Sequence, residues 1–453
     1  MAYFQRHIDK VLLEWKNSKD RKPLLIRGAR QVGKSSAVRK LGESFHYYAE
    51  INLEKQPSLK AFFTEDIDVK KTCENISTVI GIPIVPNKTL LFIDEIQSCQ
   101  PAIMSLRYFK EDYPDLHVVA AGSLLEFTLE DIPSFAVGRI RSLYMYPFSF
   151  DEFLTAQGLK MQVEAKKQAS PSSPLVEPLH RMMTEQLRTF LLVGGMPEAV
   201  SKWIENHNYA VCSQLHNDIM DTYRNDFGKY KKKVLPDLLK QVIHSVAIQI
   251  GDKFVFNQAA EGVRSPQVKD ALRLLTLAGL ITPVTHTAAN GIPLGAEEDD
   301  RYAKYLFMDT GLLLSILNIP ASDIMLASDT ELVNNGAVAE VFAGLEIIKY
   351  KDCCKKACMY YWQRHAKNAD AEIDYLEADG VTVLPIEVKA GTQGAMQSLY
   401  YFMRAKHLDH GIRTSLEGFG SFDYTDTQDN DATRHIDIYP LYALSNIGCL
   451  SAF

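Results

Sequence analysis

A glycine-rich segment near the amino terminus constrains the fold of this chain more than any other feature. The apolar run 23–27 (PLLIR) predicts a buried strand, and Gly28-Ala-Arg-Gln-Val-Gly33-Lys34-Ser35 follows it directly. A helical pattern comes next, so the spacing G-x-x-x-x-G-K-[ST] stands between a strand and a helix. This context predicts an α/β fold with a phosphate-binding loop.

The residue types at this spacing suit a bound di- or triphosphate. Gly28 and Gly33 let backbone N–H groups curl around an anion, where a Cβ would collide or forbid the dihedral angles. The following helix points its positive dipole end at the phosphates, Lys34 reaches the β and γ oxygens, and Ser35 offers a hydroxyl to Mg²⁺. The predicted nucleotide-binding residues of this loop are Gly28, Ala29, Arg30, Gln31, Val32, Gly33, Lys34, Ser35 and Ser36.

A second segment supports the same prediction. The apolar run 89–93 predicts a strand that ends in the two carboxylates Asp94 and Glu95. At the end of a strand Asp94 can hold Mg²⁺ opposite Ser35, and Glu95 can polarise the water that attacks the phosphate. Paired carboxylates are common in charged turns, but together with the glycine-rich loop they indicate hydrolysis rather than binding alone.

Two further polar positions have competing interpretations. The strand-like run 116–122 leads to Ser123, whose hydroxyl either senses the γ-phosphate or caps the next helix. Arg139 precedes the strand-like run 142–146 and either neutralises charge in the transition state, in its own chain or from a neighbour, or forms a surface salt bridge. Ser123 is therefore a candidate nucleotide-binding residue, and Arg139 a candidate catalytic residue beside Glu95.

Several longer segments resemble a known family. GARQVGKS, LFIDEIQ, AAGSLLEF, VGRI and YPFSFDEF occur in this order, and GGMPEAV (194–200), MDTGLL (308–313) and IEVKAG (386–391) follow. Together they resemble stand-alone AAA+ ATPases of bacteria and archaea that carry a nuclease-like carboxy-terminal domain. The resemblance spans nearly the entire chain. It implies a P-loop α/β fold with the parallel sheet order 5-1-4-3-2, in which Asp94 and Ser123 lie on strands that flank the P-loop strand.

The middle of the chain shows helical patterns around a polar insertion. Residues 160–178 are rich in Ser and Pro without an apolar period, which predicts an exposed loop. The helical patterns of 179–220, with a turn at 194–197, predict a lid. Residues 236–307 then follow the winged-helix order of helix, turn, helix and two strands, with Lys269 and Arg273 as candidate DNA contacts. Winged helices also serve as packing modules, so the DNA contact stays open.

Acidic residues and a lysine lie close together on strands predicted near the carboxyl end. Glu387 and Lys389 are two residues apart and therefore face one side of a sheet, where Asp374 of the preceding strand can meet them. Two carboxylates can gather Mg²⁺, and the lysine can stabilise a developing phosphate charge. The pattern predicts a second acidic site.

The spacing D-x(12)-E-x-K resembles the PD-(D/E)xK phosphodiesterase superfamily, with Ile373 in place of the usual proline. The resemblance implies an α/β nuclease-like domain with Asp374, Glu387 and Lys389 as catalytic residues. It also implies that Glu340, on the predicted helix 336–348, joins Asp374 and Glu387 as a metal ligand. Carboxylate–lysine ladders occur on ordinary sheets too, so DNA cleavage stays open.

Composition excludes several classes of protein. The chain has 453 residues, of which 46% are hydrophobic and 23% charged, which fits a soluble globular protein with sizeable cores. The longest uncharged stretch, 274–296, contains prolines and polar residues, and the amino terminus is charged where a signal peptide needs an apolar core. We therefore expect a cytoplasmic protein without membrane spans. The net charge of −7 argues against general affinity for nucleic acid, although 229–233 is a local basic run.

Cysteine usage agrees with a reducing compartment. The seven cysteines are scattered in the chain and odd in number, which argues against a disulfide framework. Cys353, Cys354 and Cys358 cluster near His365, either as a zinc site or as part of an ordinary lysine-rich helix or loop.

These patterns predict four domains: a P-loop ATPase core (1–159), a helical lid (160–232), a winged-helix-like domain (233–325) and a nuclease-like domain (326–453). We expect a Mg²⁺-dependent ATPase of the AAA+ type coupled to a nuclease-like domain, with DNA as its candidate substrate. The alternative is a nucleotide-gated regulatory protein that binds DNA or protein without cutting. A monomer and an AAA+-type ring both remain open.

Overall fold

The computed structural model describes residues 3–63, 67–123, 125–130, 138–227, 234–319, 336–364, 370–389 and 396–450. The chain divides into two compact units. The amino-terminal unit comprises residues 1–147, 277–279 and 352–356, and the carboxy-terminal unit comprises 148–276, 280–351 and 357–453. The division into four domains stays a prediction. The basic run 229–233 and His365 lie outside the described residues.

The amino-terminal unit is built on a parallel sheet of five strands in the order β2-β3-β4-β1-β5. The strands are β1 (Leu24–Arg27), β2 (Tyr47–Asn52), β3 (Thr89–Asp94), β4 (His117–Ala121) and β5 (Arg141–Tyr144). This confirms the predicted P-loop fold and its sheet order. One detail of the prediction is wrong, because only β4 of the two predicted flanking strands pairs with β1, and β3 lies one strand further out.

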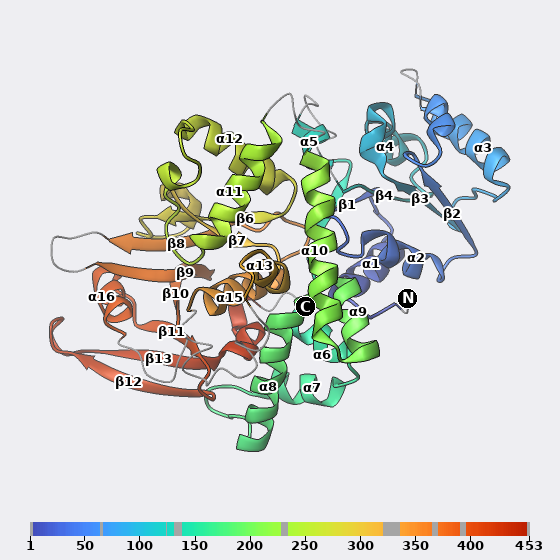
Figure 1. Ribbon diagram of the computed structural model, residues 1–453. Helices are drawn as coiled ribbons and strands as arrows, with labels where there is room; N and C mark the ends of the chain where they lie inside the picture. The colour runs from blue at the N-terminus through green and yellow to red at the C-terminus, as the bar shows by residue number, and fades with distance from the viewer. Residues whose placement is uncertain are drawn as a thin grey trace. The chain divides into compact units, whose positions relative to one another are not determined.

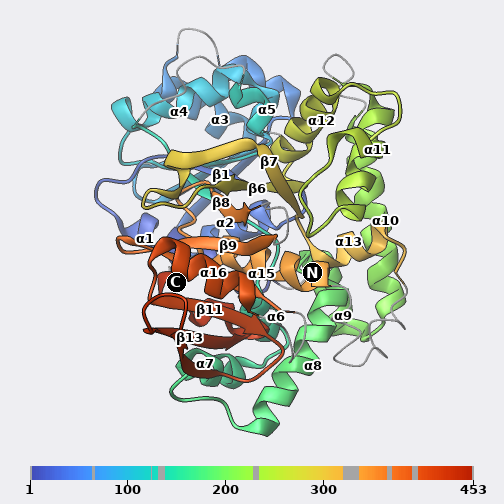
Figure 2. The same cartoon turned by 90° about the vertical axis from the view of Figure 1, so that its left-hand side faces the viewer.

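Helices cover both faces of this sheet. In Figures 1 and 2, α3 and α4 lie on one face, and α1 and α2 on the other. The helices of this unit are α1 (His7–Asn17), α2 (Lys34–Gly42), α3 (Val69–Ile80), α4 (Gln100–Asp112) and α5 (Leu125–Glu130). Because β3 is covered on both faces, all six of its residues are buried, which explains its continuous apolar sequence. The sheet thereby fixes the position of Asp94 at its carboxyl edge.

The carboxy-terminal unit contains a mixed sheet of eight strands in the order β12-β13-β11-β10-β9-β8-β6-β7. Figure 1 shows the run from β8 through β9, β10, β11 and β13 to β12. The strands are β6 (Ile281–Thr287), β7 (Glu298–Phe307), β8 (Met359–Arg364), β9 (Ala371–Asp379), β10 (Thr382–Val388), β11 (His410–Ser415), β12 (Gly420–Asp426) and β13 (Ala432–Pro440). The strands predicted for the winged-helix segment and for the nuclease-like domain thus join in one sheet, through the pairing of β6 with β8.

Ten helices of the described chain accompany this sheet or precede it. They are α6 (Phe150–Ala156), α7 (Lys160–Gln168), α8 (Glu177–Val193), α9 (Pro197–Asn206), α10 (Tyr209–Asp226), α11 (Pro236–Ile248), α12 (Ser265–Leu277), α13 (Thr310–Ile316), α15 (Gly336–Tyr350) and α16 (Gln397–Lys406). Leu399, Phe402 and Met403 of α16 pack on Trp362 and Ile373 of the sheet. Figures 1 and 2 both show α11 and α12 side by side. The two helices precede β6 and β7 in the chain, which is the order predicted for a winged helix. The winged-helix assignment itself stays a prediction.

The predicted loop at 160–178 is wrong in its first half, where the chain forms α7. The helix lacks an apolar period because one of its buried positions is a lysine. Lys166 is 1% exposed, and its Nζ lies 2.6 Å from Asp151 Oδ1 and 2.6 Å from Ser445 Oγ. A buried ion pair takes the place of apolar packing here.

The turn between α8 and α9 is held by Asp309, which brings the segments 194–200 and 308–313 together. Asp309 Oδ2 accepts a hydrogen bond from the Gly195 N–H at 2.6 Å, and its Oδ1 caps α13 through the Leu312 N–H. A Cβ at Gly194 would lie 2.2 Å from Asp309 Oδ1. These two segments therefore serve packing in the carboxy-terminal unit.

Candidate functional site

The phosphate-binding loop has the backbone geometry that its glycines predict. Gly28, Gln31 and Gly33 have positive φ angles of 139°, 63° and 98°. A Cβ at Gly28 would lie 2.1 Å from the main-chain oxygen of Met145, so no other residue fits there. Gly33 is the N-cap of α2, whose first-turn N–H groups are the natural partners of an anion.

The other loop residues have different surroundings. Ala29 and Val32 are buried, whereas Gln31 and Ser36 are exposed. The Val32 main-chain oxygen accepts a hydrogen bond of 3.0 Å from Arg6 Nη1. Arg6 Nη2 also donates to the Tyr146 oxygen at 2.8 Å, so this arginine ties the loop to the end of β5. Sequence reasoning missed Arg6, which precedes the first helix without any motif.

Lys34 is a buried cation whose partners are uncharged. Its Nζ donates to the main-chain oxygens of Gly28 at 2.8 Å and of Ala29 at 2.6 Å. Burial lowers the pKa of Lys34 to about 8, against the opposing effect of the charges on Glu95 and Asp94. The buried ammonium of Lys34 has lost water of hydration and has no anion in direct contact among the described residues. An anionic ligand at the loop would therefore stabilise it.

Ser35 and Asp94 come together as predicted for a magnesium site. Ser35 Oγ donates to Asp94 Oδ2 at 3.1 Å, and Asn52 Nδ2 donates to the same oxygen at 3.4 Å. Burial raises the pKa of Asp94, and the charge of Glu95 raises it further. A hydroxyl and a carboxylate are the oxygen ligands that Mg²⁺ prefers, so the residues fit this ion. Asn52, at the end of β2, was not predicted.

Glu95 is positioned by two side chains from neighbouring segments. Its Oε2 accepts hydrogen bonds from Gln97 Nε2 and, at 3.3 Å, from Ser123 Oγ. Glu95 also has a positive φ of 50°, which turns the chain sharply after β3. The structure thus brings Gln97 and Ser123 to the carboxylate of Glu95.

Arg139 lies on the surface and forms the salt bridge that was the alternative interpretation. Its Nε pairs with Glu111 of α4, and the two side chains are 53% and 36% exposed. A surface pair of this kind contributes little stability and can exchange partners. A catalytic role for Arg139 stays a prediction.

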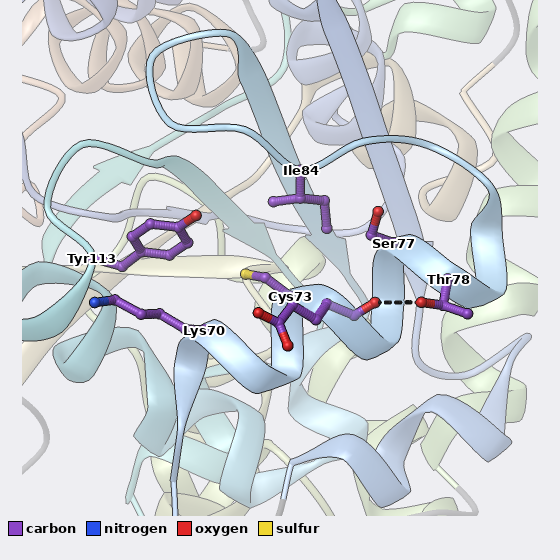
Figure 3. Close-up of a pocket in the computed structure, with 7 residues that line it drawn as sticks. Lys70, Cys73, Ser77, Thr78, Ile84 and Tyr113 are labelled. Carbon is purple, nitrogen blue, oxygen red and sulfur yellow. Dashed lines mark hydrogen bonds between the residues drawn. The ribbon is translucent and has the colours of Figure 1, made fainter.

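A pocket in the amino-terminal unit lies along α3, apart from these residues. Its volume is about 340 Å³, and Figure 3 shows Lys70, Cys73 and Ser77 of α3 facing it with Tyr113. Burial raises the pKa of the Cys73 thiol to about 12, so this cysteine is no reactive thiolate at neutral pH. None of the residues that line the pocket is a predicted site residue.

The carboxy-terminal unit contains the second acidic cluster. Carboxylate oxygens of Glu340, Glu372 and Asp374 lie within 4.8 Å of one another. Glu340 and Asp374 were predicted as metal ligands, whereas Glu372 was not. The pairing of β8 and β9 shifts register between Tyr360 and Trp362, and the centroid of the Tyr361 ring between them lies 5.3 Å from Lys304 Nζ.

A lysine that sequence reasoning missed lies among these carboxylates. Lys304 Nζ is 2.9 Å from Glu340 Oε1 and 4.0 Å from Asp374 Oδ1, and it also pairs with Glu372. Burial alone would lower the pKa of Lys304, but Glu340, Asp374 and Glu372 outweigh it and raise the pKa above its usual value. Burial raises the pKa of Glu340 to about 8, and the charge of Lys304 opposes this shift.

The predicted Glu387–Lys389 pair forms, but it does not join the group of three carboxylates. Lys389 Nζ pairs with Glu387 Oε1, while Glu387 Oε2 is buried and accepts no hydrogen bond from the described residues. Burial raises the pKa of Glu387 to about 8, with Asp374 as a second cause. Asp374 Oδ2 accepts a hydrogen bond of 2.7 Å from the Val388 N–H. The catalytic and metal-binding roles of these residues stay predictions.

The cysteine cluster gives little support to a zinc site. Asp352, Cys353 and Cys354 offer ligand atoms within 4.8 Å of one another, in the segment that belongs to the amino-terminal unit. These are three ligand residues, whereas a structural zinc site uses four.

The helices of the described part of the chain include none with the length and hydropathy of a membrane span.

Solved structures similar to this chain share little sequence with it. They include the Aeropyrum pernix Orc1 protein in complex with DNA, with 11% identity, a TM-score of 0.30 and coverage of 70% of this chain and 91% of that one. The S. cerevisiae Hsp104–ADP complex has 11% identity, a TM-score of 0.28 and coverage of 77% and 44%. Drosophila ORC bound to DNA has 11% identity, a TM-score of 0.27 and coverage of 68% and 93%. Likeness at this level says nothing about function.

Family models describe three parts of the chain. Residues 184–323 match a domain of unknown function (DUF8612), and residues 335–434 match another domain of unknown function (DUF4143). No curated protein matches the chain. Residues 20–154 match the model of an AAA domain (AAA_14), which covers β1 to β5 and the phosphate-binding loop. The five-stranded parallel sheet of the amino-terminal unit therefore lies in a segment that is similar to an AAA domain.

Proposed function

We propose that the amino-terminal unit binds ATP together with Mg²⁺ and hydrolyses it. The observation that carries this proposal is the meeting of Lys34, Ser35, Asp94 and Glu95 where the loop adjoins the end of β3. Ser35 Oγ and Asp94 Oδ2 are 3.1 Å apart, and Lys34 Nζ donates to the main-chain oxygen of Ala29 in the loop at 2.6 Å. The match to an AAA domain agrees with this chemistry.

Each of these residues has one part in the reaction. Lys34 binds the β- and γ-phosphate oxygens, and the N–H groups of the loop orient the triphosphate. Ser35 and Asp94 hold Mg²⁺, which when bound neutralises charge on the phosphates. Glu95 orients the attacking water and accepts its proton, while Ser123 and Gln97 hold the Glu95 carboxylate in place. Arg139 can add charge to the transition state only after it leaves Glu111.

For the carboxy-terminal unit the geometry favours the alternative of a nucleotide-gated regulatory protein that does not cut DNA. The observation that supports it is Lys304, whose ammonium pairs with Glu340 and lies 4.0 Å from Asp374 Oδ1, two of the three carboxylates predicted to hold a metal in this unit. Partner binding by this unit, to DNA or to a protein, belongs to the same proposal.

Substitution of two residues tests the ATPase proposal. Lys34→Ala removes the cation that binds the phosphates, so calorimetry should show ATP binding at least about tenfold weaker. Glu95→Gln keeps the binding residues but removes the base, so binding should persist while steady-state hydrolysis falls by about 10²-fold or more. Glu54→Gln, an exposed carboxylate after β2, is the control that should change neither. Undiminished hydrolysis by Glu95→Gln contradicts the role of Glu95, and absence of ATP binding by the folded parent chain contradicts the proposal.

A further inference from the structure

Lys304 is fixed in the sheet rather than mobile on the surface. It lies in β7, opposite Val284 of β6, and its side chain is only 2% exposed. Neighbouring Ala303 and Leu306 are also buried. A lysine in such a position loses its hydration and is retained only where other groups compensate the charge.

The compensation comes from three carboxylates and an aromatic ring. The ammonium lies 2.9 Å from Glu340 Oε1, contacts Glu372 and lies 4.0 Å from Asp374 Oδ1. On another side it is 5.3 Å from the centroid of the Tyr361 ring. The three carboxylates come from α15 and β9, so elements far apart in the sequence converge on this one cation.

A divalent metal does not fit the same position. Mg²⁺ and Mn²⁺ need close oxygen ligands in near-octahedral geometry, and an ammonium at the centre of the cluster both fills the space and repels a second cation. Asp374 has its other oxygen engaged with the Val388 N–H. Glu387, the remaining predicted ligand, pairs with Lys389 through Oε1, and its buried Oε2 lies outside the group around Lys304. The three carboxylates around Lys304 therefore disagree with the metal that a nuclease-like fold implies.

We propose that Lys304 is a built-in counter-cation that takes the place of a divalent metal among Glu340, Glu372 and Asp374, so that the carboxy-terminal unit does not cleave phosphodiesters. The lysine keeps the acidic cluster folded without a metal. This inference does not depend on ATP hydrolysis by the amino-terminal unit, and its failure leaves that proposal intact.

Binding of Mn²⁺ to the nucleotide-free full chain tests the proposal. All proteins carry Asp94→Asn, which removes the carboxylate that would bind the ion at the phosphate-binding loop. With Lys304 present, electron paramagnetic resonance should show no saturable Mn²⁺ site below about 1 mM. With Lys304→Met added, one Mn²⁺ site should form with affinity at least about tenfold higher, because the repelling charge is gone.

A second variant covers the case in which Lys304→Met does not fold. Lys304→Met with Glu372→Gln removes one positive and one negative charge, which preserves the charge balance while Glu340 and Asp374 remain. It should also bind Mn²⁺ more tightly than the protein with Lys304. Circular dichroism shows which variants are folded. If the folded variants bind Mn²⁺ no more tightly than the Asp94→Asn protein with Lys304 in place, the proposal is overturned.

Assays of DNA cleavage provide the other arm. The parent chain, with Mn²⁺ or Mg²⁺, should cut neither single-stranded nor double-stranded DNA. Metal-dependent cutting that Asp374→Asn and Lys389→Ala abolish would overturn the proposal. The proposal would also be overturned if a protein that retains Lys304 bound Mn²⁺ saturably and the substitution Asp374→Asn removed this binding.

Discussion

The two units each contain a buried lysine beside carboxylates, and the two lysines have opposite surroundings. Lys34 donates to the main-chain oxygens of Gly28 and Ala29, and burial lowers its pKa to about 8. Lys304 contacts Glu340 and Glu372 directly, and the neighbouring carboxylates raise its pKa. The nearest partners therefore determine whether the charge of a buried lysine is already compensated.

This difference explains why similar residue types serve different purposes in the two units. Neutral carbonyl partners leave the charge of Lys34 uncompensated, so a phosphate can bind it with a net gain. The neighbouring carboxylates compensate the charge of Lys304, so this lysine is a poorer partner for a phosphate and, by our proposal, excludes a metal. A lysine and acidic residues near each other in sequence or space thus do not by themselves define a catalytic site.

The largest expected effect concerns the stability of the carboxy-terminal unit. Lys304→Met leaves Glu340, Glu372 and Asp374 without their cation, which should lower the free energy of unfolding by about 3–5 kcal/mol. Lys34→Met removes a charge with no ionic partner in contact, so the amino-terminal unit should change by less than about 1 kcal/mol or become more stable. Denaturation followed by tryptophan fluorescence measures both, because Trp15 lies in the amino-terminal unit and Trp203 and Trp362 lie in the other.

The double variant Lys304→Met with Glu372→Gln is the matched control, since it should recover part of the lost stability. If Lys304→Met and Lys34→Met changed the free energy of unfolding of their own units by equal amounts, the proposed difference between the two lysines would be contradicted.

A smaller effect is expected from pH, and it sharpens the same comparison. The pKa of Lys34 is about 8 in the folded unit and about 10.5 in the unfolded chain. Between these values the unfolded chain binds more protons, so Lys34 makes the amino-terminal unit more stable as pH rises from about 8 to 10.5 and gives no such gain below. Lys304 should stay protonated throughout this range.

NMR of isotope-labelled lysine side chains in the nucleotide-free chain measures both titrations. Lys34→Met and Lys304→Met identify the two signals. Titration of Lys34 near 10.5, or of Lys304 below it, would contradict the assigned surroundings.

The sequence predicted the amino-terminal unit well because its information is local. The glycine spacing, the lysine and the apolar strands stand within short segments, and β3 ends at Asp94, which the sheet brings to its carboxyl edge. The contact of Asn52 with Asp94 escaped prediction because β2 meets β3 only through the sheet, without a motif to signal it.

The carboxy-terminal unit was less predictable because its decisive residue looks ordinary in sequence. Lys304 stands in the strand EDDRYAKYLF, whose charged residues suggest an exposed face. Its partners follow 36, 68 and 70 residues later, at Glu340, Glu372 and Asp374. Similarly, the sequence predicts a loop where α7 forms, because the buried residue Lys166 pairs with Asp151 and does not contribute to an apolar period. A helix that is buried through an ion pair does not show the apolar period from which helices are predicted.

The number of Mn²⁺ ions bound per chain tests the central claim most directly. With a non-hydrolysable ATP analogue present, the account predicts one Mn²⁺ per chain, at the phosphate-binding loop, which Asp94→Asn removes and Asp374→Asn does not. A second Mn²⁺ that Asp374→Asn removes, or a single Mn²⁺ that survives Asp94→Asn, would contradict it.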